Sequence, residues 1–460
     1  MFRNIFNTFA NCFKIPELKS RIIFTILVLA VCRLASFIPV PSVDGSALAA
    51  FARAHNNGGG LFGLTGMFSG GAMEHCAIGA LGIMPYISAT IIIQLMTAVI
   101  PTLSKLAREE NGRAQIIKYS RYLTVLLCMG WGVFQAISWE NPGKVFSGYD
   151  GPPLVHSSHI WLYRMQTVLV LTTGTMILLW LGEQITERGV GNGVSLIITV
   201  NILSRLPQAA VGLIDLFTSR GNVEARLNLG HGVLLIVLMV LVIGGCIAIT
   251  QAQRKIPVQY AQRAVGRKMY QGGTSFMPLR VNYAGVMPVI FASAILMFPQ
   301  RIFSMIGTSY DIPFLRTLGY ALDYGTPWYL ALYGLMILFF SYFWVATQFN
   351  ELQISDDLKK NGGYIPGVRP GQATSDYLHN TMSRITLAGA IMLTVIAVIP
   401  IILSKAMGMD QNVSQFFGGT SMLIAVGVML DTMRQMESHL MMRHYDGFLK
   451  KGKLRGRFSS

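Results

Sequence analysis

Few residues of this chain have types and spacings that could support catalysis. Gly189, Gly191 and Gly193 alternate in the run RGVGNGVSL, a pattern that could cradle a phosphate. A dinucleotide site would need a strand before these glycines and a βαβ unit around them, whereas apolar runs flank them on both sides. The chain also has no P-loop, HExxH or GxSxG motif. We therefore predict no catalytic residues and no enzymatic activity.

The cysteines do not suggest chemistry either. They are scattered without a CxxC pair, so neither a disulfide framework nor a zinc site is predicted. We expect no metal and no cofactor. The five are Cys12, Cys32, Cys76, Cys128 and Cys246.

Two ionisable residues inside long apolar runs are candidates for ion or proton handling. A charge at the centre of a membrane span costs roughly 2.5 kcal/mol or more. Arg33 lies a few residues before the end of its run, so we expect its side chain to snorkel to the interface. Asp431 also lies near the end of its run and can reach water. No pairing of carboxylates or histidines predicts a proton relay.

The elements that must position these residues are membrane helices. The chain has 460 residues, of which 52% are hydrophobic and 13% charged, whereas soluble domains are about 25% charged. The apolar runs are long enough to cross a bilayer as helices and lack the alternation of barrel strands. No secretory signal peptide is evident. The ten runs are residues 22–39, 77–100, 122–139, 161–181, 193–211, 231–250, 281–298, 327–349, 385–403 and 417–433.

Basic residues predict the orientation of these runs. Both tails and the gaps 101–121, 183–192, 251–280 and 350–384 together hold 27 Lys and Arg, against 8 on the other side when Arg205 near a helix end is included. The positive-inside rule therefore places both termini in the cytoplasm, and it explains most of the net charge of +16 without nucleic acid. Two sets of five spans would form an inverted repeat. The N-terminal phenylalanines at positions 2, 6, 9 and 13 share one helical face, which predicts an amphipathic helix on the inner surface.

Six stretches, taken in order, resemble the SecY family, whose members form the central subunit of the bacterial protein-conducting channel. The resemblance covers essentially the whole chain. The stretches are MFSGGAMEHCAIGALGIMPYISATIIIQL, LGEQITERGVGNGVSLII, QRKIPVQYAQRAVGRKMY, VNYAGVMPVIFASAI, LKKNGGYIPGVRPGQAT and FFGGTSMLIAV.

The resemblance assigns the short segment before the second span as a plug, a short helix that folds back into the outer funnel. Thirteen helical residues would reach only about 20 Å, too short to cross a bilayer. An ordinary interfacial loop is the alternative from the residues alone. The plug residues are Met67, Phe68, Ser69, Gly70, Gly71, Ala72, Met73, Glu74, His75, Cys76, Ala77, Ile78 and Gly79.

The resemblance also implies a ring of branched apolar side chains that closes around a threading polypeptide and disfavours water and ions when empty. Val194 stands where the family often has isoleucine, which leaves a methylene-sized gap. Each residue by itself could instead face lipid or the core. The ring residues are Ile83, Ile87, Val194, Ile198, Ile290 and Ile424.

The second and seventh runs correspond to the faces of the family's lateral gate toward lipid. We expect prolines to loosen these helices and polar side chains to latch the closed gate, although the polar residues could equally serve ordinary helix packing. The gate residues are Pro85, Ser88, Thr90, Gln94, Asn282 and Pro288, with Gly82 beside them.

The cytoplasmic loops correspond to the family's docking site for the ribosome or the SecA motor. Gap 251–280 has six basic residues and no acidic one. Arginine pairs with rRNA phosphates or with carboxylates. The implied contact residues are Arg254, Lys255, Arg263, Arg267, Lys268 and Arg369, some of which could simply be solvated charge.

We therefore predict an all-α membrane protein of ten transmembrane helices, in two inverted five-helix halves around a central pore with a short plug helix. It would move unfolded secretory chains across the bacterial cytoplasmic membrane and release apolar segments into lipid, after signal-sequence recognition. The resemblance adds SecE and SecG as partner subunits. The rivals are a ten-span secondary transporter and a structural scaffold. The predicted regions are 1–21 (amphipathic tail), 22–211 (first half, plug 67–79), 231–433 (second half, loops 251–280 and 350–384) and 434–460 (cytoplasmic tail).

Overall fold

A computed structural model describes most of the chain, and a helix lies in each of the ten predicted runs. The described residues are 16–54, 66, 68–109, 112–145, 151–156, 159–217, 229–260, 263–265, 268–270, 274–309, 312–407 and 420–451. The phenylalanine helix expected at the N-terminus lies outside them.

Ten helices overlap the predicted runs, one helix for each run. Several extend beyond their runs, and the fifth run is divided after Leu203. These helices are α2 (Pro16–Leu34), α5 (Met84–Val99), α7 (Gly112–Glu140), α9 (Ile160–Arg188), α10 (Gly193–Leu203), α12 (Leu229–Gln251), α13 (Met287–Ser309), α15 (Pro327–Gln348), α17 (Gln372–Ala406) and α19 (Thr420–Lys451).

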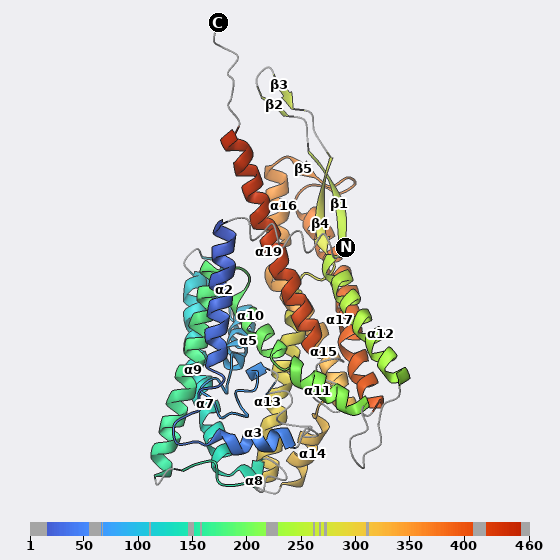
Figure 1. The fold of residues 1–460 in the computed structure, drawn as a ribbon. Helices are drawn as coiled ribbons and strands as arrows, with labels where there is room; N and C mark the ends of the chain where they lie inside the picture. Colours follow the sequence, from blue (N-terminus) through green and yellow to red (C-terminus); the bar gives the residue numbers. More distant parts are fainter. Residues whose placement is uncertain are drawn as a thin grey trace.

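Shorter helices connect or flank the long ones. In Figure 1, α3, α8 and α14 lie at one end of the molecule, and α16 lies at the other end with the strands. The shorter helices are α3 (Gly45–Ala54), α6 (Pro101–Arg108), α8 (Pro142–Val145), α11 (Leu206–Phe217), α14 (Pro313–Ala321) and α16 (Glu351–Lys360).

Seven helices of the described chain are long and apolar enough to cross a membrane, or eight if α5 and α6, which bend by 106°, count as one span. The helix α2 carries four charged residues, including Arg21 and Arg33, and α19 contains Asp431 and Arg434. These charges lower the mean hydropathy of both helices. The number of ten spans therefore stays a prediction.

Local sequence explains where the helices of the expected gate begin. Pro85 lies in the first turn of α5, and Pro288 is the second residue of α13. A proline in the first turn removes no intrahelical hydrogen bond. The expectation that these two prolines loosen the helices is therefore wrong, and both start helices instead. The proline in the interior of α13 is Pro299.

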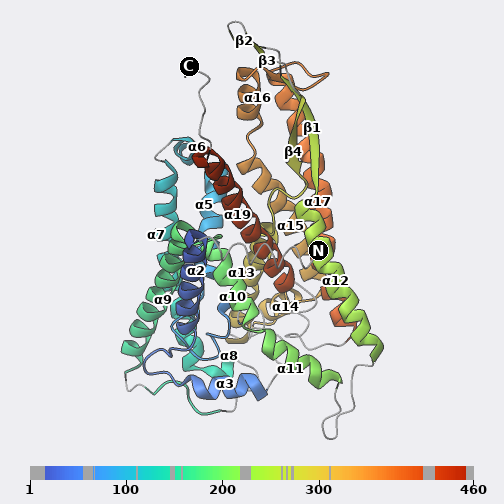
Figure 2. The ribbon, with the colours of Figure 1, turned by 45° about the horizontal axis from the view of Figure 1, so that its top comes forward.

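The cytoplasmic loops of the prediction contain β-structure. The strand β1 (Gln253–Tyr260) pairs antiparallel with β4 (Thr274–Arg280) and β5 (Gly363–Tyr364). The shorter β2 (Arg263–Val265) and β3 (Lys268–Tyr270) pair at the tip. Figures 1 and 2 show this hairpin projecting from the end of the molecule opposite α3. Its base packs Ile256 and Leu279 against Leu378 and Met382 of α17, so the two loops form one unit.

Candidate functional site

The segment assigned as the plug is a compact series of turns. Within Phe68–Gly79, only Phe68 and Ser69 are helical, and turns continue to Ile83. Gly70, Gly71 and Cys76 have φ angles of +63°, +91° and +47°, and positive φ is incompatible with a right-handed helix. The expected plug helix is therefore wrong in its secondary structure. Met67 lies outside the described residues. We call Phe68–Gly79 the plug segment.

The C-terminal part of the plug segment is fixed to the chain that follows α2. The amides of Ile78 and Gly79 donate to the carbonyls of Ile38 and Ala35, at 2.9 and 3.1 Å. Val40 N–H donates to the Cys76 carbonyl at 2.8 Å. These backbone bonds leave Phe68–His75 as the part that can move without breaking them.

Three polar side chains from other segments hold that movable part, and Glu74 of the movable part pairs with one of them. Arg205, just after α10, donates from Nη2 to Glu74 Oε1 at 2.6 Å, and the two side chains are only 16% and 12% exposed. Asn201 Nδ2 donates to the Phe68 carbonyl at 2.9 Å. Arg33 Nη1 donates to the Gly70 carbonyl at 3.1 Å and to Asn201 Oδ1 at 3.4 Å. We call Arg33, Glu74, Asn201 and Arg205 the polar clamp.

The polar clamp was not found from the sequence. The snorkelling expected of Arg33 is wrong, because its guanidinium is directed to the plug segment. A signal was present in the spacing of Asn201 and Arg205, which lie four residues apart inside an apolar run. Such a pair shares one helical face, but its partner could not be read from that spacing.

The six residues assigned to the ring come together in one apolar cluster. They lie just before and within α5, on α10, on α13 and on α19. Val194 packs against the cluster and is half-buried, and the other five are at most 5% exposed. Phe68 of the plug segment belongs to the same cluster. The plug segment and the ring residues are thus in one continuous packing unit.

The helices of the expected gate, α5 and α13, contact each other. Two of the four polar residues assigned to the gate have local partners. Thr90 donates to the Tyr86 carbonyl of its own helix, and Asn282 donates to the Gly285 carbonyl. Gln94 Oε1 is buried with no hydrogen-bond partner, and Ser88 is half-buried. The gate latch stays a prediction.

A small cavity of about 30 Å³ separates the plug segment from the gate helices. Ser69, Ser88 of α5, Gln135 of α7 and Ala294 of α13 contribute to its lining. Ser69 Oγ and Gln135 Nε2 are buried without a partner in the protein. A cavity of this size with two free polar groups fits one buried water molecule.

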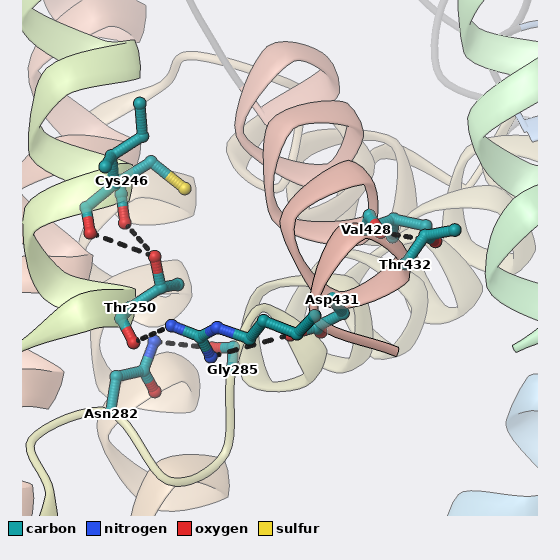
Figure 3. A network of polar contacts seen from close by, with 9 residues as sticks. Cys246, Thr250, Asn282, Gly285, Val428, Asp431 and Thr432 are labelled. Carbon is teal, nitrogen blue, oxygen red and sulfur yellow. Dashed lines mark hydrogen bonds and ion pairs between the residues drawn. The ribbon is translucent and has the colours of Figure 1, made fainter. Parts of the chain in front are cut away.

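A larger cavity of about 390 Å³ opens between α10, α13 and α19, and Arg280, Asp431 and Arg434 line part of it. Figure 3 shows Asp431 on α19, Thr250 on α12 and the Asn282–Gly285 turn in one network of polar contacts. Arg434 donates to the Thr250 carbonyl and lies 4.0 Å from Asp431. The Asp431 side chain is 54% exposed, as expected for an aspartate at the end of its run. No cluster of described His, Cys, Asp or Glu could hold a metal ion.

The residues assigned to docking lie on the hairpin and on the loop beside it. Arg254 and Lys255 of β1 and Arg369 are exposed. Arg263 begins β2 and Lys268 begins β3, and Arg267 lies outside the described residues. The strands themselves were not predicted from the sequence. The alternation of Ile256 and Val258 was the available signal, because both are buried on one face of β1.

These features define a class of protein: a multi-pass helical membrane protein whose helices α5, α10, α13 and α19 meet in one buried apolar cluster, in which Phe68 of the plug segment also packs. A sequence model described as SecY matches residues 77–433. The chain belongs to the SecY family, and the resemblance seen in its motifs is confirmed.

Relatives of nearly the same length support this assignment. The chain is 41% identical to the protein translocase subunit SecY of Chlamydia trachomatis, over 98% of this chain and 99% of the relative. It is 40% identical to that of Thermotoga maritima, over 98% of this chain and 100% of the relative. By its family the chain is a subunit of a protein-conducting channel and not an enzyme.

Solved structures share the fold. One is described as a protein conducting channel, with a TM-score of 0.60, 18% identity and coverage of 91% of this chain and 92% of that chain. Another, a study of the SecY plug domain, has a TM-score of 0.59 at 18% identity over the same shares. Sec61 in a canine ribosome-channel complex has a TM-score of 0.56 at 17% identity, over 91% and 92% of the two chains.

Proposed function

We propose that unfolded secretory chains cross the membrane through the constriction formed by Ile83, Ile87, Val194, Ile198, Ile290 and Ile424. The plug segment closes this path from the outside. Apolar segments leave sideways between α5 and α13 into lipid. Signal sequences start the process by displacing one gate helix from the other.

One observation carries this proposal. Six residues that are far apart in the sequence belong to, or pack against, one buried cluster, and Phe68 of the plug segment packs in it too. Branched apolar side chains can fit around a polypeptide of any sequence because they require no specific hydrogen bonds. When empty, such a constriction excludes water and therefore ions.

The rival function, a secondary transporter, needs convergent polar or ionisable groups at the middle of the membrane. The cluster at the constriction is apolar instead. A scaffold without a pore would show no conductance when the plug segment is replaced by a short linker, whereas a channel would conduct ions.

The proposal extends to partners and location. The exposed Arg254, Lys255 and Arg369 suit rRNA phosphates or carboxylates of the SecA motor, because arginine and lysine pair with both. SecE and SecG would complete the complex in the bacterial cytoplasmic membrane. Both termini would face the cytoplasm, with ten spans in halves 22–211 and 231–433. In Figure 1 the first residues of α2 and the last of α19 lie toward the end that carries the hairpin, which supports this orientation.

Crosslinking tests the path. Single cysteines replace Ile87 and Ile290 in a background without the five native cysteines, and a stalled secretory chain carries a photoreactive or thiol-reactive probe. We expect both positions to react. Ile92 of α5 and Met429 of α19, which are 39% and 51% exposed, are the outward controls and should not react. Equal reaction at all four positions would contradict the proposed path.

A further inference from the structure

The polar clamp connects the plug segment to a helix that also carries constriction residues. Asn201 lies on α10, and Arg205 follows two residues after the last residue of that helix. The same helix carries Val194 and Ile198. Asn201 lies three residues beyond Ile198, about 4.5 Å along the helix axis. A displacement of α10 that moves Ile198 outward therefore moves Asn201 by a similar amount.

The contacts of the clamp are short and directional, so a small displacement breaks them. The Arg205–Glu74 contact is 2.6 Å and the Asn201–Phe68 contact is 2.9 Å. A hydrogen bond of this kind is lost by about 3.5 Å. The side chains of the clamp lie close against the plug segment, since a β-carbon at Gly70 would lie 2.4 Å from Arg33 Nη1 and 2.9 Å from Asn201 Oδ1.

We propose that Asn201 and Arg205 are positioning residues that hold the plug segment shut and release it when α10 moves as the constriction widens. This inference rests on the proposed function. The incoming polypeptide never needs to push the plug segment itself. It widens the constriction at Ile198, and the same motion separates Asn201 from Phe68 and Arg205 from Glu74.

Because the Arg205–Glu74 ion pair is largely buried, the closed arrangement of the plug segment depends on both charges being paired. While it is formed, each charge has its partner in a region of low exposure. If one partner is removed, the other is left buried and unpaired, which disfavours the closed arrangement strongly. Once the plug segment leaves, water enters and hydrates both charges, so the released state is also stable.

A charge swap tests the clamp in the complete translocation complex, reconstituted in liposomes. Glu74→Arg and Arg205→Glu should each raise ion leak about tenfold or more, and the double swap should restore much of the seal. The matched control is the Arg164–Glu140 pair between α7 and α9, at 2.7 Å. Swapping that pair should leave the leak unchanged. Single variants that leak no more than the unmodified complex would overturn the proposal.

A second measurement separates positioning from a merely structural role. A cysteine at Ser69, 3% exposed, reports plug release through labelling by a membrane-impermeant thiol reagent. We expect labelling only when a stalled chain is present, and labelling without a chain in Arg205→Glu. Arg205→Lys, which keeps the charge, should retain part of the protection. Protection that persists while a stalled chain crosslinks at Ile290 would refute the coupling yet leave the proposed path intact.

Discussion

At the scale of single residues, closure of the proposed channel depends on the shape of its apolar side chains and on the pairing of its polar side chains. Ile290 is 1% exposed in the cluster, whereas Val194, one methylene smaller than isoleucine, is half-buried. The polar clamp and the constriction meet at Phe68. Closure thus combines two kinds of contact that respond differently to substitution.

The first prediction concerns the size of the constriction residues. Ile290→Ala should raise the ion leak of the reconstituted complex several-fold, because it leaves a gap in a packed ring. Val194→Ile should lower it. Ile302→Ala on the same helix α13, at a position 36% exposed, is the control and should not change the leak. Equal leak in the two alanine variants would argue against a ring at Ile290.

The second prediction uses Asp323, which lies between α14 and α15. Burial raises the pKa of this carboxyl above its ordinary value, although Tyr324 N–H, Lys405 and Gln300 partly offset the rise. An acid whose pKa is raised in the folded state binds more protons in the folded than in the unfolded protein. Its contribution to stability therefore falls as the pH rises from the pKa of the unfolded state through the pKa of the folded state.

Asp323→Asn keeps an oxygen that can accept both hydrogen bonds and removes the titration. We therefore expect the thermal unfolding midpoint of the variant, relative to the unmodified complex, to be higher at pH 8 than at pH 4. A difference that is the same at both pH values would show that Asp323 does not titrate in this way.

At the scale of elements, the local pattern was enough to find the helices but not their contacts. Apolar runs and prolines fix where α5, α13 and α15 begin, because both act on neighbouring residues. The division between α10 and α11 occurs at Ser204 and Arg205, inside an apolar run, and Arg205 is held there by Glu74 from a distant segment. The turns of the plug segment likewise depend on Arg33 and Asn201, which sequence spacing does not connect to them.

The third prediction concerns the contact between α9 and the plug segment. A β-carbon at Gly174 would lie 2.5 Å from the Ile78 carbonyl oxygen, which is backbone and cannot move aside easily. Gly174→Ala should lower stability by about 1–3 kcal/mol, as overpacking does, and should raise ion leak.

The control for this contact is Gly130→Ala in α7. A β-carbon there meets nothing within 4 Å, so the substitution should be neutral or stabilise the helix by up to about 1 kcal/mol. Thermal unfolding midpoints and ion leak, measured on both variants, distinguish a specific clash at Gly174 from a general effect of an added methyl group. Similar losses in the two would mean that any added methyl group in these helices is harmful.

At the scale of the whole molecule, the apolar cluster that we propose as the constriction lies within the helical body, and the exposed Arg254 and Lys255 lie on the hairpin beyond it. The hairpin is not isolated, because its base packs on α17 and Arg434 of α19 donates to Thr250 at the end of α12. The same α19 carries Ile424 of the constriction. Under the proposed function, a partner bound to the hairpin would therefore contact a unit that packs on α17 and adjoins α12.

The fourth prediction follows from the basic residues on the hairpin. Replacing Arg254 and Lys255 by alanine should weaken ribosome binding by the complex and reduce the salt dependence of log K by about 1.5, at about 0.7–0.9 per phosphate contact. Replacing the exposed, uncharged Gln253 and Thr274 by alanine should change neither. Co-sedimentation over a range of salt concentrations measures both. An unchanged slope in the charged variant would place the ribosome contact elsewhere.

The backbone bonds between Ala35–Val40 and Cys76–Gly79 have a kinetic consequence. Under the proposed function, a plug segment bonded at its C-terminal part cannot diffuse away from the constriction. Its effective concentration there stays in about the millimolar range typical of short linkages. Reclosure after each client is then a first-order step whose rate does not depend on how many channels the membrane contains.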